Sequence, residues 1–543
     1  MAVDEAWWQR AAIYHIYPLS FADSDGDGVG DLAGITSRLG YLAGEPDSLG
    51  VDAIWLSPIF RSPMVDFGYD IADHCDIDPR FGTLADAETL IEQAHHHGLR
   101  VLFDFVPNHT SDQHAWFVDA LSGPAAEHRH CYVWADPAAG GGPPNNWRSA
   151  FAKVGSAWTL DEASGQYYLH SYTPEQPDLN WRNPAVRAAM HDVLRFWLDR
   201  GVDGFRVDAP HRIAKDPELR DNPPDVVNML LSTQLDDRRH RNIDHEDVHE
   251  LIRGLRSVLD EYPDRVLIGE VGVRHPVRRM AYHGSAGDEF QLIFDFGYLD
   301  TGWDAQSFRA LGERLDRQPD PRRWPTHVLS NHDLSRSATR FSGPGAGIDQ
   351  VLARARAAAV LLLTLPGTAF VYYGEEIGMT DVPVPAEQTA DPDGRDPYRT
   401  PMQWSDSFAG GFTTGRPWLP VPAAPALSKV NMAAQQGDPS SLLSLYRRLI
   451  ALRAAEPRLT GGDYQGVAAA EQVYAFTRRT GSGGLLVAIN FSGEPVIARL
   501  PAGELGTAPG RLVLSTGSRA AGTAVVLGEL VLEPAEAAII ELD

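Results

Sequence analysis

The sequence predicts an α/β protein: a (β/α)8 barrel of the TIM type, with an inserted loop-rich subdomain after strand 3 and a C-terminal antiparallel β-domain. Short apolar runs recur along the chain with amphipathic segments between them, which is the order that βα units produce. Polar and charged residues cluster where these runs end, on the side where a barrel places its active site. Two stretches break the alternation and account for the additional domains.

Eight apolar runs are the predicted barrel strands. A doubly wound sheet would give a similar string, and the position of the polar residues is what favours the barrel. The segments 85–97 and 184–200 have the 3.6-residue periodicity of amphipathic helices. The predicted strands cover residues 12–21, 51–60, 100–109, 201–208, 265–271, 292–297, 326–333 and 368–378.

Two regions depart from this alternation. Residues from about 110 to 175 are rich in Gly, Pro, Trp and Asn, which is typical of an irregular insertion. From Asp463 onward, short alternating runs broken by glycine indicate a β-sandwich. The predicted domains are therefore a barrel formed by 1–109 and 176–460, an insertion at 110–175 and a C-terminal domain at 461–543, with 420–439 as a connection to the last barrel helix.

Composition excludes some classes of function. The 543 residues carry a net charge of −26, and such a surface repels nucleic acid and anionic membranes. The first residues contain no apolar run of signal-peptide length, and the longest apolar stretch, near 357–365, is too short to cross a membrane. The two cysteines, Cys75 and Cys131, form neither a disulfide framework nor a zinc site. We expect a cytoplasmic protein; the oligomeric state is left open.

Three acids stand at the ends of predicted strands: Asp208, Glu270 and Asp333. A buried carboxylate is costly unless it is paired, so packing alone seldom places one there. Any one of them alone could be a helix N-cap. Together on one barrel rim they supply what glycoside cleavage needs, namely a nucleophile, a proton donor and further negative charge near an oxocarbenium-like transition state.

Arg206 lies two residues before Asp208, so the two side chains share one face of the strand. Its guanidinium would keep Asp208 ionised and oriented. Glu270 needs a raised pKa to act as an acid, and neighbouring carboxylates with partial burial would provide it. We expect these groups to surround a single sugar ring.

Four motifs resemble the signature regions of the α-amylase superfamily of glycoside hydrolases: Phe-Val-Pro-Asn-His at 105–109, Gly-Phe-Arg-Val-Asp at 204–208, Gly-Glu-Val at 269–271 and Ser-Asn-His-Asp at 330–333. The resemblance implies a retaining mechanism in which Asp208 is the nucleophile, Glu270 the acid/base and Asp333 a transition-state stabiliser. It also implies that His109 and His332 bind sugar, and that Arg206 is the arginine of the second region.

Three further motifs resemble the α-glucosidase and oligo-1,6-glucosidase branch: Asp-Phe-Gly-Tyr-Asp at 66–70, Gln-Pro-Asp-Leu-Asn-Trp at 176–181 and Arg-Thr-Pro-Met-Gln-Trp at 399–404. By this resemblance Asp66 and Arg399 bind hydroxyls of the terminal glucose, and Tyr69 stacks on its face. Such a closed pocket favours exo-action on short substrates.

The residue after the nucleophile bears on linkage. In this branch it tends to be Val in α-1,6-specific enzymes and Ala or Thr in α-1,4-acting ones, and here it is Ala209. We therefore predict a retaining exo-α-glucosidase for maltose and short α-1,4-glucosides, with transglucosylation as a side reaction. The alternatives are an oligo-1,6-glucosidase, a trehalose or isomaltulose synthase, and a sucrose hydrolase. A non-catalytic relative, such as a transporter heavy chain, is disfavoured because all three acids are present.

An aspartate-rich loop follows the first predicted strand. Carboxylates at alternate positions, with glycines between them and the Val29 carbonyl, suit a hard cation. The loop resembles the start of an EF-hand, but Gly34 stands where the closing Glu would be. By the family resemblance it binds Ca2+, or Mg2+, as a structural ion; the alternative is a solvated acidic turn. The predicted ligands are Asp23, Asp25, Asp27, Val29 and Asp31. The run 95–97, three histidines at a predicted helix end, is not expected to bind metal.

Overall fold

The computed structural model describes residues 6–223, 240–273, 275–316, 324–391, 393–481, 483–505 and 509–542. The chain divides into two compact units. The first unit comprises Met1–Ile54, His96–Leu99 and Asp295–Asp543, and the second comprises Trp55–His95 and Arg100–Phe294. Within the described ranges, no helix combines the length and apolar character needed to span a membrane.

Eight strands form a nearly closed parallel barrel with helices between them, and the predicted fold class is confirmed. Their order in the sheet is β11-β10-β9-β5-β2-β1-β13-β12. Each strand falls inside one predicted run and is shorter than that run; after β1, for example, residues Pro18–Phe21 form the buried helix α2. They are β1 Ala12–Ile16, β2 Ala53–Leu56, β5 Arg100–Phe105, β9 Gly204–Val207, β10 Val266–Gly269, β11 Leu292–Ile293, β12 Thr326–Val328 and β13 Thr368–Tyr372.

The first unit contains β1, β13 and β12, paired in parallel register, and two long helices, α13 (Ile348–Thr364) and α16 (Leu442–Ala455). Ser441 caps α16 by accepting the backbone N–H of Ser444. Segment 420–439, predicted as a connection, contains two single-turn helices. The shorter helices of this unit are α1 Trp7–Arg10, α2 Pro18–Phe21, α3 Leu32–Ser37, α4 Leu39–Leu42, α11 Ala305–Asp316, α12 Ser337–Ser342, α14 Ala424–Leu427, α15 Met432–Gln435, α17 Pro457–Thr460 and α18 Ala502–Leu505.

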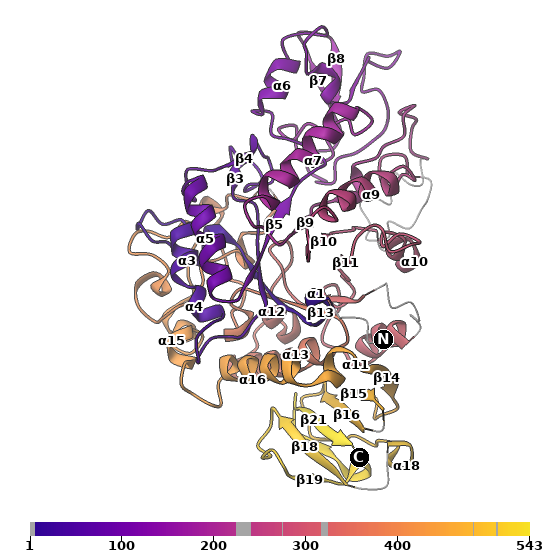
Figure 1. The fold of residues 1–543 in the computed structure, drawn as a ribbon. Coiled ribbons are helices and arrows are strands. Elements are labelled where there is room, and N and C mark those ends of the chain that lie inside the picture. Colours follow the sequence, from indigo (N-terminus) through magenta and orange to yellow (C-terminus); the bar gives the residue numbers. More distant parts are fainter. Residues whose placement is uncertain are drawn as a thin grey trace. The chain divides into compact units, whose positions relative to one another are not determined.

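The C-terminal part of the first unit is an antiparallel sheet in the order β14-β15-β16-β21-β18-β19 (Figure 1), which confirms the predicted antiparallel β-domain. Alternating residues such as Leu486, Leu512 and Ile540 form its apolar core. β17 (Val496–Ile497) pairs separately with β20 (Val531–Leu532). The six strands are β14 Asp463–Val467, β15 Val473–Thr480, β16 Gly483–Asn490, β18 Gly510–Ser515, β19 Ala524–Val525 and β21 Ala537–Leu542.

The second unit contains β5, β9, β10 and β11 with the helices α7 (Pro184–Leu198) and α9 (Val248–Leu259) and most of α5 (Leu84–His96). α7 begins where the sequence indicates, because the Asn183 side chain accepts the Ala185 N–H and Pro184 occupies the first turn. Its buried face includes Met190, Leu194 and Trp197. This unit also contains β3 Phe60–Arg61, β4 Asp73–Ile77 and α10 Pro276–Ala281.

The region 110–175 contains a small sheet of its own, in the order β6-β8-β7 (Trp134–Ala135, Gln166–Leu169, Trp158–Asp161), and the helix α6 (Ala115–Ala120). β7, β8 and α6 gather together in Figure 1. Trp147, Trp158 and Leu169 form a core cluster, so aromatic packing replaces the regular pattern that sequence periodicity would detect. The domain boundaries at 109/110, 175/176 and 460/461 stay predictions.

Candidate active site

One guanidinium joins two of the predicted catalytic acids. Asp208 follows β9 directly and Glu270 follows β10 directly, and these strands are neighbours with Val207 opposite Gly269. Arg206 Nη1 lies 2.8 Å from Asp208 Oδ1, and Arg206 Nη2 lies 2.7 Å from Glu270 Oε2. The arginine is buried, while the two carboxyl side chains stay 12% and 21% exposed. The site therefore presents two accessible carboxylates on one fixed cation.

A third acid on this cation, Asp104, is absent from the sequence predictions. Asp104 lies opposite Arg206 in the register of β5 and β9, and its Oδ1 is 2.7 Å from Arg206 Nη1. The Tyr69 hydroxyl donates to its other oxygen at 3.0 Å. Burial raises the pKa of Asp104 to about 6, although Arg206 opposes the shift. The available signal was a single acid inside the apolar run 101–106.

Three predicted sugar-binding residues of the second unit lie together. Asp66 is buried, and its carboxylate accepts a hydrogen bond from Gln176 Nε2 at 3.1 Å. His109 Nε2 lies 3.1 Å from the Tyr69 carbonyl oxygen and 3.1 Å from the same Gln176 nitrogen. Burial lowers the pKa of His109, so the ring is neutral at neutral pH. Asp66, Tyr69 and His109 thus form one buried polar cluster.

The other predicted residues, His332, Asp333 and Arg399, lie in the first unit. β12 ends at Val328, so Asp333 belongs to the following loop and not to the predicted strand 326–333. Asp333 Oδ1 accepts from Arg399 Nη2 at 3.1 Å, and its Oδ2 lies 3.2 Å from His332 Nε2. Arg399 Nε also donates to the His332 carbonyl oxygen at 2.7 Å. The convergence of this group with Asp208 and Glu270 on one sugar ring stays a prediction.

Two residues around Asp333 were also missed by the sequence predictions. Arg395 Nη1 donates to Asp333 Oδ1 at 3.2 Å, and Arg395 Nη2 donates to Asp391 Oδ1 at 2.6 Å. Burial disfavours the ionised form of Asp391, but the bonds from Arg395 outweigh it and lower the pKa of Asp391. Because Asp391 and Arg395 are four residues apart in an irregular segment, neither periodicity nor a strand end marks them.

Comparison with known proteins agrees with this geometry. Residues 15–462 match the family model described as the alpha amylase catalytic domain. The chain belongs to the alpha-amylase family. It is 40% identical over 517 residues to a probable alpha-glucosidase of Rhizobium meliloti, with 92% of each chain covered. It is 37% identical over 539 residues to an oligo-1,6-glucosidase of Parageobacillus thermoglucosidasius, covering 92% of this chain and 93% of the relative.

A solved structure extends the comparison. A mutant isomaltulose synthase from Erwinia rhapontici, in complex with its natural substrate sucrose, superposes with a TM-score of 0.89 at 34% identity, and all of each chain is covered. The chain is therefore an alpha-glucosidase-like glycoside hydrolase of the group that includes alpha-glucosidases, oligo-1,6-glucosidases and sucrose isomerases.

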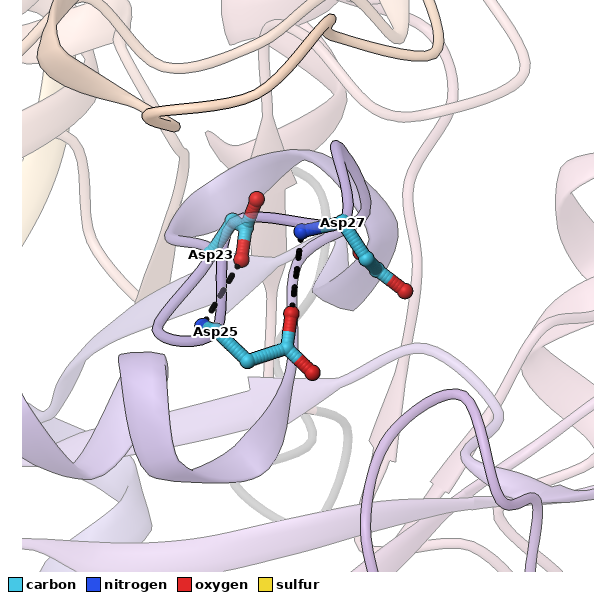
Figure 2. A group of neighbouring side chains, drawn as sticks. All are labelled: Asp23, Asp25 and Asp27. Carbon is cyan, nitrogen blue, oxygen red and sulfur yellow. Dashed lines mark hydrogen bonds between the residues drawn. The ribbon is translucent and has the colours of Figure 1, made fainter.

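The aspartate loop of this family member contains a compact acidic cluster. Carboxylate oxygens of Asp23, Asp25 and Asp27 lie within 4.8 Å of one another. Figure 2 shows the wrap that brings them together, with the Asp25 N–H donating to Asp23 at 3.0 Å and the Asp27 N–H donating to Asp25 at 3.0 Å. A Cβ at Gly28 would lie 1.9 Å from the Arg416 carbonyl oxygen, so only glycine fits there. Closely spaced carboxylates on a tight loop fit a hard cation.

The other two predicted ligands have defined roles in the loop. Asp31 caps α3, because its Oδ1 accepts the Gly34 N–H at 2.7 Å, and its Oδ2 accepts the Ser24 N–H at 2.7 Å. The Val29 N–H donates to Asp27 at 2.8 Å. Their coordination of an ion stays a prediction.

The second unit also contains a cavity of about 670 Å³. Its described lining includes Trp134, Trp181, Lys215 and Asp216, and none of the three predicted catalytic acids. The Arg129 guanidinium lies over the ring of Trp134, with its carbon 3.3 Å from the ring centroid.

Proposed function

We propose that the protein is a retaining, exo-acting α-glucosidase that releases glucose from the non-reducing end of maltose and short α-1,4-glucosides. The observation that carries this proposal is the attachment of Asp208 and Glu270 to the one buried guanidinium of Arg206. A retaining glycosidase needs two carboxyl groups on opposite sides of one scissile bond and close enough for direct attack.

The roles follow from this arrangement. Asp208 attacks the anomeric carbon while Glu270 donates its proton to the departing oxygen, which leaves a glucosyl ester on Asp208. Glu270, now ionised, takes a proton from water, and the water oxygen attacks the anomeric carbon, which breaks its bond to the Asp208 oxygen and frees the carboxylate. Asp333, held by Arg395 and Arg399, adds negative charge near the oxocarbenium-like transition state.

The binding roles rest on the family motifs together with burial. Asp66 and Arg399 are buried charged groups, which suits charge-assisted hydrogen bonds to sugar hydroxyls. His109 and His332 add hydrogen bonds, and Tyr69 supplies an aromatic surface. Asp23, Asp25 and Asp27, with the Val29 carbonyl and Asp31, would hold a structural Ca2+ or Mg2+ that tightens the loop.

Specificity within the group depends on the second sugar of the substrate and on the molecule that accepts the glucosyl group. The relation to oligo-1,6-glucosidases and to the sucrose-bound isomaltulose synthase supports α-1,6 hydrolysis, sucrose hydrolysis or sucrose isomerisation as the second candidate. Ala209 supports the α-1,4 choice, since a small side chain beside Glu270 leaves room for the second sugar; the Ala209 N–H lies 3.3 Å from Glu270 Oε2.

The test is incubation with maltose, isomaltose, sucrose and starch separately, with product analysis by chromatography. We expect glucose from maltose at the highest rate and little release from starch. NMR of the first product should show α-glucose, the mark of retention. Asp208→Asn and Glu270→Gln should each lose turnover while Asp260→Asn, an exposed control, keeps it. Isomaltose as the best substrate, or isomaltulose formed from sucrose, would select the second candidate instead.

A further inference from the structure

Lys215 is a buried lysine that the catalytic roles above do not use. It follows the short helix Pro210–Arg212 in the loop after β9. Its ammonium lies 2.8 Å from Asp178 Oδ2 and donates to Asn108 Oδ1 at 2.9 Å. Burial lowers the pKa of Lys215, although Asp178 opposes this shift, while Lys215 and the hydrogen bonds from Ser171 outweigh burial and lower the pKa of Asp178.

This contact and the Asp178 carboxylate together fix which way the Asn108 amide points. An ammonium can only donate, so the Asn108 atom facing Lys215 is the oxygen. The amide nitrogen then faces the opposite side, where it lies 2.9 Å from Asp178 Oδ1 and 3.1 Å from His109 Nδ1. Its two hydrogens match these two acceptors. His109 Nδ1 is consequently an acceptor and carries no proton.

The other contacts of His109 favour the same tautomer. With its proton on Nε2, the ring donates to the Tyr69 carbonyl oxygen and accepts from Asn108, which satisfies two of three neighbours. With its proton on Nδ1, only the contact with Gln176 is satisfied. The Gln176 amide is itself oriented, because the Thr173 N–H donates to its oxygen and its nitrogen donates to Asp66.

We propose that Lys215 is a positioning residue that, through Asn108, holds His109 with its proton on Nε2, so that the imidazole presents a donor toward the glucose subsite formed with Asp66 and Tyr69. This inference rests on the proposed function for the identity of the ligand. The tautomer itself rests on the hydrogen bonds that His109 makes with Asn108, Tyr69 and Gln176, and does not depend on the proposed function. In the structure this proton faces the Tyr69 carbonyl oxygen at 3.1 Å, and a sugar hydroxyl oxygen, which also accepts a hydrogen bond, would share the proton or replace that acceptor.

The first measurement uses the wild-type chain with 15N-labelled histidine. NMR shifts of the two ring nitrogens, assigned with a His109→Gln variant, should show a protonated Nε2 and an unprotonated Nδ1 at His109. A protonated Nδ1 in the wild type overturns the proposal without any further variant.

The second measurement removes the donor. In Lys215→Met we expect the His109 shifts to move toward a tautomer mixture, the KM for maltose to rise about tenfold, as loss of one hydrogen bond to the sugar would give, and kcat to change less. Lys429→Met, whose ammonium is half exposed, should leave the shifts and the KM unchanged. His109 shifts identical to wild type in a folded Lys215→Met protein would overturn the proposal.

Loss of Lys215 leaves Asp178 as a buried unpaired charge, so the single variant can fail to fold. Lys215→Met with Asp178→Asn removes both charges and keeps an acceptor for Asn108. The proposal expects this double variant to fold and still show the altered His109 shifts, whereas wild-type shifts would mean that Lys215 only neutralises Asp178. If the wild type releases no glucose from any glucoside, the proposed function fails, and the 15N shifts still decide the role of Lys215.

Discussion

Asp104 and Arg206 stand opposite each other on β5 and β9, and their Oδ1 and Nη1 atoms lie 2.7 Å apart with both side chains buried. The same guanidinium holds Asp208 and Glu270, so one positive charge serves three carboxyl groups. Burial disfavours its charged form, yet Asp104 and Glu270 outweigh burial and raise the pKa of Arg206. Asp104 therefore anchors the cation to which the two proposed catalytic acids are bound.

Asp104→Asn should lower both stability and activity. The variant removes one charge-assisted bond to a buried guanidinium that keeps two other carboxylates, so we expect a loss of about 2 kcal/mol in the free energy of unfolding. We expect kcat/KM for maltose to fall about tenfold or more, because Arg206 loses the contact that fixes it. Urea denaturation and steady-state kinetics measure the two effects.

The control for this variant is Asp76→Asn, in which an exposed ion pair with Arg61 at 3.4 Å is lost. Such a pair contributes about 0 to 1 kcal/mol. Equal effects of the two substitutions would show that Asp104 has no special role.

We expect the buried carboxyl group of Glu375 to make the stability of the fold depend on pH. It is buried in the short helix Glu375–Ile377, where the Tyr446 hydroxyl donates to it at 2.9 Å, and burial raises its pKa to about 7. A folded-state pKa above the unfolded value of 4.5 means that the native state holds the proton more tightly. The stabilisation is thus complete below about pH 4.5 and is lost as the pH rises through 7.

Glu375→Gln should remove this dependence, because an amide does not titrate. A shift from 4.5 to about 7 corresponds to about 3 kcal/mol over that interval. Relative to wild type, the melting temperature of the variant should rise progressively between pH 5 and pH 8, as measured by calorimetry. Glu387→Gln, at an exposed site, should track the wild type at every pH. A constant offset between Glu375→Gln and wild type would contradict the assignment.

Most of the barrel was predictable because each βα unit leaves a local signature. The runs ending near Asp208 and Glu270 were apolar and bounded by polar residues, and strand ends are where a barrel exposes functional groups. Asp104 was not predictable in this way, since its partner Arg206 is about a hundred residues away and only strand register brings them together. The contacts among Lys215, Asp178 and Asn108 could not be predicted for the same reason, because the three residues are far apart in the sequence and only the fold brings them together.

We expect Ala209 to control linkage preference, and we expect a β-branched residue at this position to lower stability. Its backbone is left-handed, with φ 41° and ψ 43°, a region that β-branched residues rarely adopt. Ala209→Val should raise the ratio of isomaltose to maltose hydrolysis and lower the free energy of unfolding by about 1 to 3 kcal/mol. Competition assays and urea denaturation measure the two effects.

Ala209→Gly is the matched control, because glycine adopts the left-handed region without strain and is also small. We expect it to retain wild-type stability and the preference for maltose. An unchanged substrate ratio in Ala209→Val would show that Ala209 does not control linkage preference.

The aspartate loop should couple cation binding to stability but not to the chemical step. Asp23 accepts from the Thr413 hydroxyl and from the Gly26 N–H at 2.7 Å; partial burial opposes ionisation, yet these donors lower the pKa of Asp23, so the carboxylate is charged at neutral pH. At a Ca2+ concentration of 100 times Kd, the ion should add about 2.7 kcal/mol to the free energy of unfolding. Chelator should remove this increment while kcat, measured well below the melting temperature, stays constant.

Asp25→Asn should abolish the Ca2+-dependent rise in melting temperature, and Asp47→Asn, which changes an exposed acid outside the loop, should preserve it. Equal Ca2+ responses in both variants would mean that the cluster is a solvated turn stabilised by its own backbone hydrogen bonds.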